Sequence, residues 1–138
     1  MPGDAGSIEY SLREPFERAV DIVCISLASR GLRVAGQLDV SLRIERALGI
    51  VPIPCRIVFV LPSAATLSTD NSNPQAALFL PLHVVFSSKE AQTEIWVQNR
   101  VQAGPEVASS ALFGPVMEAQ SKIAEAIEAI AMRPSIVS

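Results

Sequence analysis

The sequence predicts an α+β fold in two layers, with helices packed on one face of a largely antiparallel sheet of about five strands. Short segments in which apolar and polar residues alternate recur at 8–12, 32–40 and 93–100, a pattern typical of strands. Two longer segments, after residues 15 and 115, place apolar residues three and four apart, as helices with one buried side do. Two neighbouring strands are separated only by a short polar segment, which predicts a hairpin.

The first predicted strand, 8–12, leads into a helix that begins at Pro15 and ends at Gly31. Proline suits the first turn of a helix because its missing N–H has no partner there, and glycine readily adopts the left-handed conformation that ends a helix. One apolar stripe runs along this helix, formed by Phe16, Ala19, Val20, Val23 and Leu27. The strand at 32–40 follows, with apolar residues at alternate positions, namely Leu32, Val34, Leu38 and Val40.

A short second helix is expected to follow this strand. Either Asp39 or Ser41 can cap its N-terminus, and Gly49 can end it. Its charged residues are predicted to form a solvent-facing side rather than a charged site; they are Arg43, Glu45 and Arg46.

The second half of the chain carries the remaining elements. A strand at 55–61 follows two prolines that keep the chain extended, and a strand at 76–86 is apolar on both faces. One or two helical turns are expected at 63–69 and a short helix at 105–113. The last helix begins near Pro115, and its buried side consists of Val116, Gln120, Ile123, Ile127 and Ile130.

The predicted hairpin carries the only histidine and the only tryptophan of the chain. A turn centred between Lys89 and Glu90 sets His83 opposite Trp96, on the same face of the sheet. The other face of the hairpin is predicted to be core, with Leu80, Leu82, Val84, Phe86, Ile95 and Val97.

The face around His83 and Trp96 is the candidate functional surface, and several uses of it stay open. It can be a homodimer interface, or be covered by a loop, with Trp96 as the anchor. It can line a pocket for a small amphipathic or anionic metabolite, with Phe79 and Trp96 as apolar walls and Arg100 or Arg33 holding an acidic group. It can simply be solvated. The ligand or interface candidates are Phe79, His83, Trp96, Gln98, Arg100 and Arg33.

An enzyme that uses His83 as acid or base is the weakest alternative. Such a histidine needs an orienting carboxylate and a nucleophile or polarising group within hydrogen-bond reach. Glu94 is the only acid near His83 in the predicted hairpin, and no serine elbow, phosphate-binding glycine loop or paired-acid motif is present. One histidine cannot build a zinc site unaided, so no metal and no cofactor are expected.

Composition and charge set the broad class. A chain of 138 residues with 49% hydrophobic residues is expected to form a single domain over 1–138, with flexible termini at 1–6 and 134–138. A net charge of −3 with scattered basic residues argues against nucleic acid as a partner. The sequence contains no apolar run long enough to cross a membrane and no secretory signal, so a cytoplasmic protein is expected. Cys24 and Cys55 lack metal or redox spacing and are expected to be buried free thiols.

The order of several short motifs resembles the DUF302 family, whose fold is called TT1751-like. The resemblance covers roughly residues 8–132. Its motifs are the helix ending in Gly31, the strand ending in Asp39, Leu48-Gly49, the strand running into Pro62, Leu78-Phe79-Leu80-Pro81, Pro105-Glu106 and Gly114-Pro115 before the terminal helix.

What the resemblance implies is a small bacterial or archaeal α+β domain that forms dimers and whose biochemical role is not established. This chain departs from the family pattern at two places. Members often have Cys-Asn-Pro where this chain has Val60-Leu61-Pro62, and Leu-Pro-Cys where it has Leu80-Pro81-Leu82. Cysteine chemistry in relatives therefore does not transfer to this chain. Residues and resemblance together favour a homodimeric binding or accessory module over a catalyst.

Overall fold

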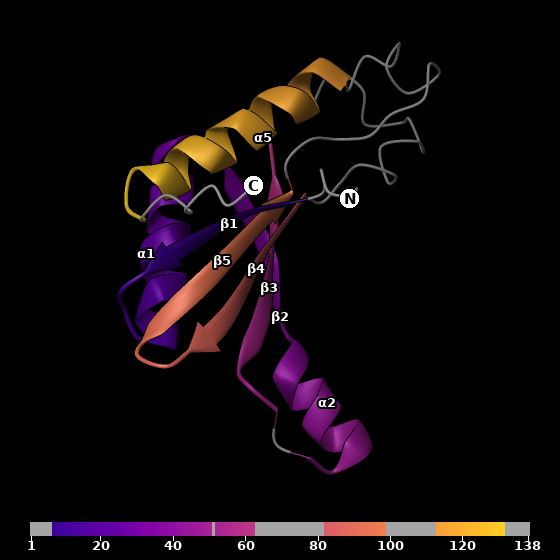
Figure 1. Cartoon of the computed structure of the whole chain (residues 1–138). Coiled ribbons are helices and arrows are strands. Elements are labelled where there is room, and N and C mark those ends of the chain that lie inside the picture. Colours follow the sequence, from indigo (N-terminus) through magenta and orange to yellow (C-terminus); the bar gives the residue numbers. More distant parts are fainter. Residues whose placement is uncertain (1–6, 51, 63–81, 99–112, 132–138) are drawn as a thin grey trace, which may run out of the picture.

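The computed structural model describes residues 7–50, 52–62, 82–98 and 113–131 (Figure 1). Most of the elements expected at 63–69, 76–81 and 105–113 lie outside these ranges. The described elements are, in chain order, β1 (Ser7–Leu12), α1 (Phe16–Ser29), β2 (Arg33–Asp39), α2 (Val40–Leu48), β3 (Cys55–Leu61), β4 (Leu82–Lys89), β5 (Gln92–Gln98) and α5 (Phe113–Glu128).

The strands form one five-stranded sheet in the order β1-β5-β4-β3-β2, and every neighbouring pair is antiparallel. Strand β4 is therefore the central strand, with β1 and β2 at the edges. Helices α1 and α5 pack on one face of this sheet (Figure 1), which we call the inner face. The predicted α+β class, with a sheet of five strands and helices on one face, is confirmed.

The core lies between the inner face and these two helices. The predicted apolar stripes are buried there: Ala19, Val20, Val23 and Leu27 from α1, and Val116, Gln120, Ile123 and Ile127 from α5. The sheet contributes Tyr10, Leu12, Val58, Val60, Leu82, Val84, Phe86, Ile95 and Val97. Two hydrogen bonds connect distant segments across this layer. The Tyr10 hydroxyl donates to Glu128 Oε2 at 2.8 Å, and the Ser26 hydroxyl donates to the carbonyl oxygen of Ala126 at 2.8 Å.

Strand β2 differs from its prediction in one respect. A bulge lies between Val34 and Gly36, so that Val34 is opposite Val60 on the inner face while Leu38 is opposite Ile57. Because a bulge inserts one residue, alternation inverts beyond it. Leu38 is therefore on the face away from α1 and α5, and the prediction that it shares a face with Val34 is wrong.

Helix α2 begins at an N-cap that the sequence left undecided. The carboxylate of Asp39 accepts a hydrogen bond from the backbone N–H of Leu42 at 2.9 Å, while the Ser41 hydroxyl donates to the same oxygen at 2.6 Å. Gly49 ends the helix in the left-handed conformation, with φ of 73°. None of the residues of α2 is buried, and the helix projects past the end of the sheet, apart from α1 and α5 (Figure 1).

The β4–β5 hairpin forms as expected, but its register is shifted by two residues. Lys89 is opposite Gln92, so that Trp96 is opposite Val85 and not opposite His83. The predicted pairing of His83 with Trp96 is wrong, although both residues keep their predicted face because the shift is an even number. No glycine, proline, asparagine or aspartate marks this turn, so the sequence does not locate it.

Candidate functional site

The face of the sheet opposite α1 and α5, here called the outer face, carries the candidate surface. Strand pairing sets Glu9, Trp96, Val85, Ile57 and Leu38 in one row that crosses all five strands. Four of these five side chains are apolar, and all five are partly exposed. The row therefore forms an apolar band across the sheet, centred on β4 and acidic at its β1 end.

His83 lies next to this band and is exposed. It is opposite Phe59 on β3, and the two rings meet edge to face with their centroids 5.3 Å apart. Glu94 is opposite Ser87, four residues along β4 from His83, which corresponds to about 13 Å. The predicted hairpin register instead sets Glu94 near His83. The only nearby acid of the predicted hairpin is thus too distant to orient His83, which weakens the acid–base alternative.

Two carboxyl groups meet at the corner of the outer face formed by β1 and β5. Glu9 and Glu94 share a hydrogen bond, and Lys89 Nζ lies 3.3 Å from Glu94 Oε2. Burial, this hydrogen bond and repulsion from Glu94 raise the pKa of Glu9 above its ordinary value of 4.5, while the charge of Lys89 opposes the rise. We call Glu9 and Glu94 the acidic corner. One lysine faces two carboxyl groups there, so the corner carries a net negative charge when both carboxyl groups are ionised.

The other predicted residues are placed less closely together. Arg33 is exposed and lies on β2, separated from the strand of Trp96 by β3 and β4. At about 4.8 Å per strand this separation is about 14 Å, so these two residues do not meet in one small pocket. The backbone of Gln98 belongs to β5, and Phe79 and Arg100 lie outside the described residues.

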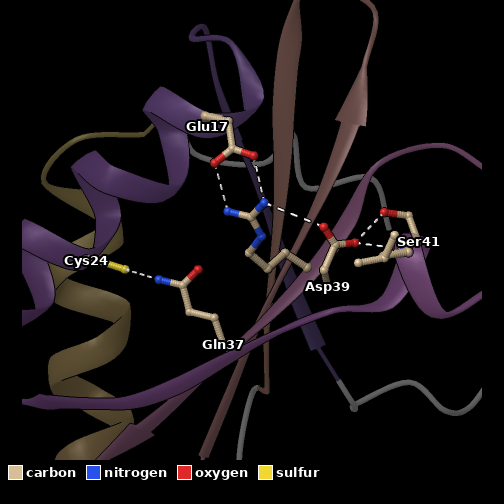
Figure 2. A network of polar contacts seen from close by, with 7 residues as sticks. Glu17, Cys24, Gln37, Asp39 and Ser41 are labelled. Atoms are coloured by element: carbon tan, nitrogen blue, oxygen red, sulfur yellow. Dashed lines mark hydrogen bonds and ion pairs between the residues drawn. The ribbon is translucent and has the colours of Figure 1, made fainter.

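A second group of polar side chains lies on the helix side, where α1, β2, β3 and α2 approach one another (Figure 2). The guanidinium of Arg56 donates to both oxygens of Glu17, at 2.9 and 2.6 Å, and lies 3.8 Å from Asp39 Oδ2. Its carbon Cζ is also 5.2 Å from the centroid of the Phe16 ring. Among the described residues, Glu17 and Phe16 belong to the first turn of α1 and Asp39 caps α2, so this group fixes the helix starts and shows no reactive arrangement.

The two cysteines are free and lie on opposite sides of the sheet. Cys24 is half-buried on α1, where Gln37 Nε2 lies 4.0 Å from its sulfur (Figure 2). Cys55 is half-buried on β3 opposite Ser87, which places it on the outer face. Burial raises the pKa of both thiols, so neither is an activated nucleophile. The prediction of free thiols is confirmed, although both are less buried than expected.

Two broader classes of function were also tested on the described residues. Within the described ranges, no group of three or more histidine, cysteine or acidic residues is arranged to hold a metal ion. No helix in those ranges has the length and apolar character needed to cross a membrane.

Sequence reasoning missed the acidic corner and the contribution of β3 to the surface. Glu9 and Glu94 are 85 positions apart and meet only because β1 pairs with β5. Ile57 and Phe59 belong to the part of β3 from Ile57 to Leu61 that is apolar at every position, so the sequence does not distinguish its outer-face side chains from those in the core.

Comparison with known proteins gives a family but no activity. The family model for DUF302, a domain of unknown function, matches residues 8–130. A crystal structure of an uncharacterized conserved DUF302 protein from Bacillus stearothermophilus superposes with a TM-score of 0.74 at 16% sequence identity. That similarity covers 90% of this chain and 97% of the other, and at such low identity it shows the fold alone. No protein among the curated sequences matches the chain. With the matching fold and a family match over most of its length, the chain belongs to the DUF302 family.

Proposed function

We propose that the protein is a homodimeric binding or accessory module and that the outer face of its sheet is the dimer interface. The observation that carries this proposal is the apolar band of Trp96, Val85, Ile57 and Leu38, which is partly exposed on the face away from the core. Partly exposed aromatic and aliphatic side chains of this kind, surrounded by polar groups, mark interaction surfaces more often than plain solvent-facing sheets.

A second copy of the chain suits this band because of its symmetry. A two-fold axis along the central strand β4 places β5 of one protomer over β3 of the other. Trp96 then meets the partner's Ile57 and the partner's Phe59, and the same contact forms again on the other side of the axis. Face-to-face packing of two sheets in roughly aligned directions is a common arrangement that encloses apolar side chains of both.

The pocket and enzyme alternatives have less support. The pocket needs Arg33 or Arg100 beside Trp96, and Arg33 lies two intervening strands away. The enzyme needs a group that orients His83, and Glu94 is too distant along the sheet. The pocket alternative uses only Trp96 of the apolar band and the enzyme alternative uses none of it, although the band crosses the whole outer face.

The change Trp96→Ala tests the proposal by sedimentation velocity over a range of protein concentrations. Truncation of an aromatic anchor in an interface raises the free energy of association by about 2 kcal/mol, so the dimer dissociation constant is expected to rise roughly thirtyfold. Ile25→Ala is the matched control, because Ile25 is a 70% exposed apolar side chain on α1, away from the outer face. The control should dimerise like the unmodified protein.

Two results would contradict the proposal. One is a wild-type protein that stays monomeric at all concentrations. The other is a folded Trp96→Ala variant, with an unchanged circular dichroism spectrum, whose dissociation constant equals that of the wild type.

A further inference from the structure

Helix α2 and the segment after it form an exposed apolar projection that its own protomer does not cover. The projection, here called the arm, comprises Val40–Leu48, residues 49 and 50, and residues 52–54. Five large hydrophobic side chains are exposed in the described part of the chain, and four of them lie in the arm: Leu42 (41%), Leu48 (67%), Ile50 (53%) and Ile53 (66%). A helix of nine residues without buried side chains is marginal by itself in water, so the arm needs a covering surface.

The arm also carries positive charge that has no ion-pair partner among the residues that the structure describes. Arg43 and Arg46 are exposed on α2, and within the described ranges neither takes part in an ion pair. Together with Leu38, Asp39, Leu42 and Ala47 they line a hollow of about 540 Å³ at the end of β2. Leu38 is also the last residue of the apolar band. The hollow is therefore continuous with the outer face, and the arm extends the same surface.

The acidic corner lies where a partner's arm can reach it. Glu94 belongs to the row of Ser11, Ser87 and Cys55, which lies one step from the apolar band toward the end of the sheet where α2 begins. The acidic corner and α2 are thus at the same end of the strands but at opposite edges of the sheet. A two-fold axis along β4 exchanges the two edges and keeps the end. It brings the acidic corner of each protomer to the α2 side of the other.

The size of the sheet also favours a role for the arm in the interface. Five strands of about six residues cover about 24 Å by 20 Å, or about 500 Å², whereas a stable interface buries about 800 Å² on each partner. The flat footprint of the sheet is smaller than that accessible area, and the arm provides more apolar surface beside it. From the exposed apolar side chains, the charges at opposite edges and the area needed, we infer that the arm of each protomer docks on the acidic corner of the second copy, with Arg43 and Arg46 facing the partner's Glu9 and the partner's Glu94.

This inference rests on the proposed homodimer but fixes its arrangement and assigns the arm a role. The raised pKa of Glu9 agrees with it, because a carboxyl group desolvated beside Glu94 has a charge that a guanidinium would stabilise. Docking supplies the counter-charge that Lys89 alone does not. It also brings counter-charges to Arg43 and Arg46.

A charge-swap experiment tests the arrangement. One variant is Arg43→Glu/Arg46→Glu and the other is Glu9→Lys/Glu94→Lys. In each variant alone, like charges meet at both symmetric contacts, so the homodimer dissociation constant should rise at least tenfold. In an equimolar mixture the reversed charges match again, and native mass spectrometry should show the heterodimer as the dominant species. Arg18→Glu/Lys122→Glu is the control for the arginine variant, because it makes the same change in net charge on α1 and α5.

The outcomes separate the two proposals. A wild type that is monomeric at all concentrations overturns the homodimer. A wild-type dimer together with variants that dimerise as tightly overturns the docking of the arm and leaves the homodimer standing. Two weakened variants that form no excess heterodimer on mixing also overturn the arm contact, provided thermal unfolding shows that both are folded. A variant pair that fails to fold is replaced by Arg43→Gln/Arg46→Gln, which should weaken the dimer and reduce its salt sensitivity, while an unchanged salt dependence overturns the contact.

Discussion

Glu90 occupies a backbone conformation that its side chain disfavours. It is the first residue of the two-residue loop between Lys89 and Gln92, and its φ of 57° lies in the left-handed region. For a residue with a Cβ atom this region is less favourable by about 1–2 kcal/mol, whereas glycine adopts it without strain. The hairpin therefore stores a small amount of strain at its turn.

Glu90→Gly is expected to stabilise the protein for this reason. Relief of the strain outweighs the larger backbone entropy of glycine in the unfolded chain, so the free energy of unfolding should rise by about 0.5–1 kcal/mol in chemical denaturation. Ala91→Gly is the matched control, because Glu90 is the only residue other than glycine with positive φ in the described ranges. A destabilised Glu90→Gly variant would show that the turn is not strained.

At the scale of single elements, Arg56 holds the start of α1 against the sheet. Its side chain is 16% exposed, contacts the Phe16 ring and forms the bidentate pair with Glu17, whose own side chain is 72% exposed. The hydrogen bonds from Arg56 hold the pKa of Glu17 below its ordinary value of 4.5, with the positive charge of Arg56 adding to the effect and burial opposing it. The pair thus stabilises the folded state only while Glu17 is ionised.

Glu17→Gln should therefore alter stability in a way that depends on pH. The folded state has the lower pKa, so the contribution of the pair is fully present above pH 4.5 and is lost as the pH falls through the pKa of folded Glu17. At pH 7 the change should lower the free energy of unfolding by roughly 0.5–1 kcal/mol, since solvent screens so exposed a group. The difference from the wild type should shrink in acid, as measured by urea unfolding at several pH values.

The control for this prediction is Glu118→Gln. It removes the exposed pair of Glu118 with Lys122 on α5, whose closest atoms are 3.5 Å apart. A pair of this kind within one helix contributes about 0.3–0.5 kcal/mol. A Glu17→Gln variant that loses no more stability than this control, or whose loss is equal at pH 7 and pH 3, would contradict the role given to the pair.

The helices, strands and turns also show how much of the structure the sequence predicts. Periodicity identified α1, α5 and the core side of the hairpin, because the buried stripes of these elements repeat without interruption. It did not identify the bulge near Gly36, although a single glycine inside a strand often marks one, and it did not identify the turn at Glu90, which no typical turn residue marks. The candidate site was predicted in part. Trp96 and His83 share the expected face, while the acidic corner depends on a pairing of β1 with β5 that spans most of the chain.

For the whole molecule, the fold separates two surfaces with different roles. The inner face and the helices α1 and α5 bury the core, whereas the outer face presents an apolar band with an acidic corner at one edge and a basic arm at the other. A dimer formed through two outer faces would have four layers, with the two sheets in the middle and the helices of each protomer on the surface of the dimer. In that dimer Cys55 lies within the interface, whereas Cys24 lies on α1, away from the interface.

Alkylation of the two cysteines during dilution is the most direct test that the outer face is covered by a second copy. Samples of the wild type above and below its dissociation constant are treated with iodoacetamide, and the modification of each cysteine is followed by peptide mass spectrometry. Cys55 should react more slowly as the dimer forms, while Cys24 should react at one rate throughout and so serve as the control within the same chain. If Cys55 in the dimer, identified by sedimentation at twice the 14.7 kDa mass of the chain, reacts as fast as in the monomer, the outer face is not the interface.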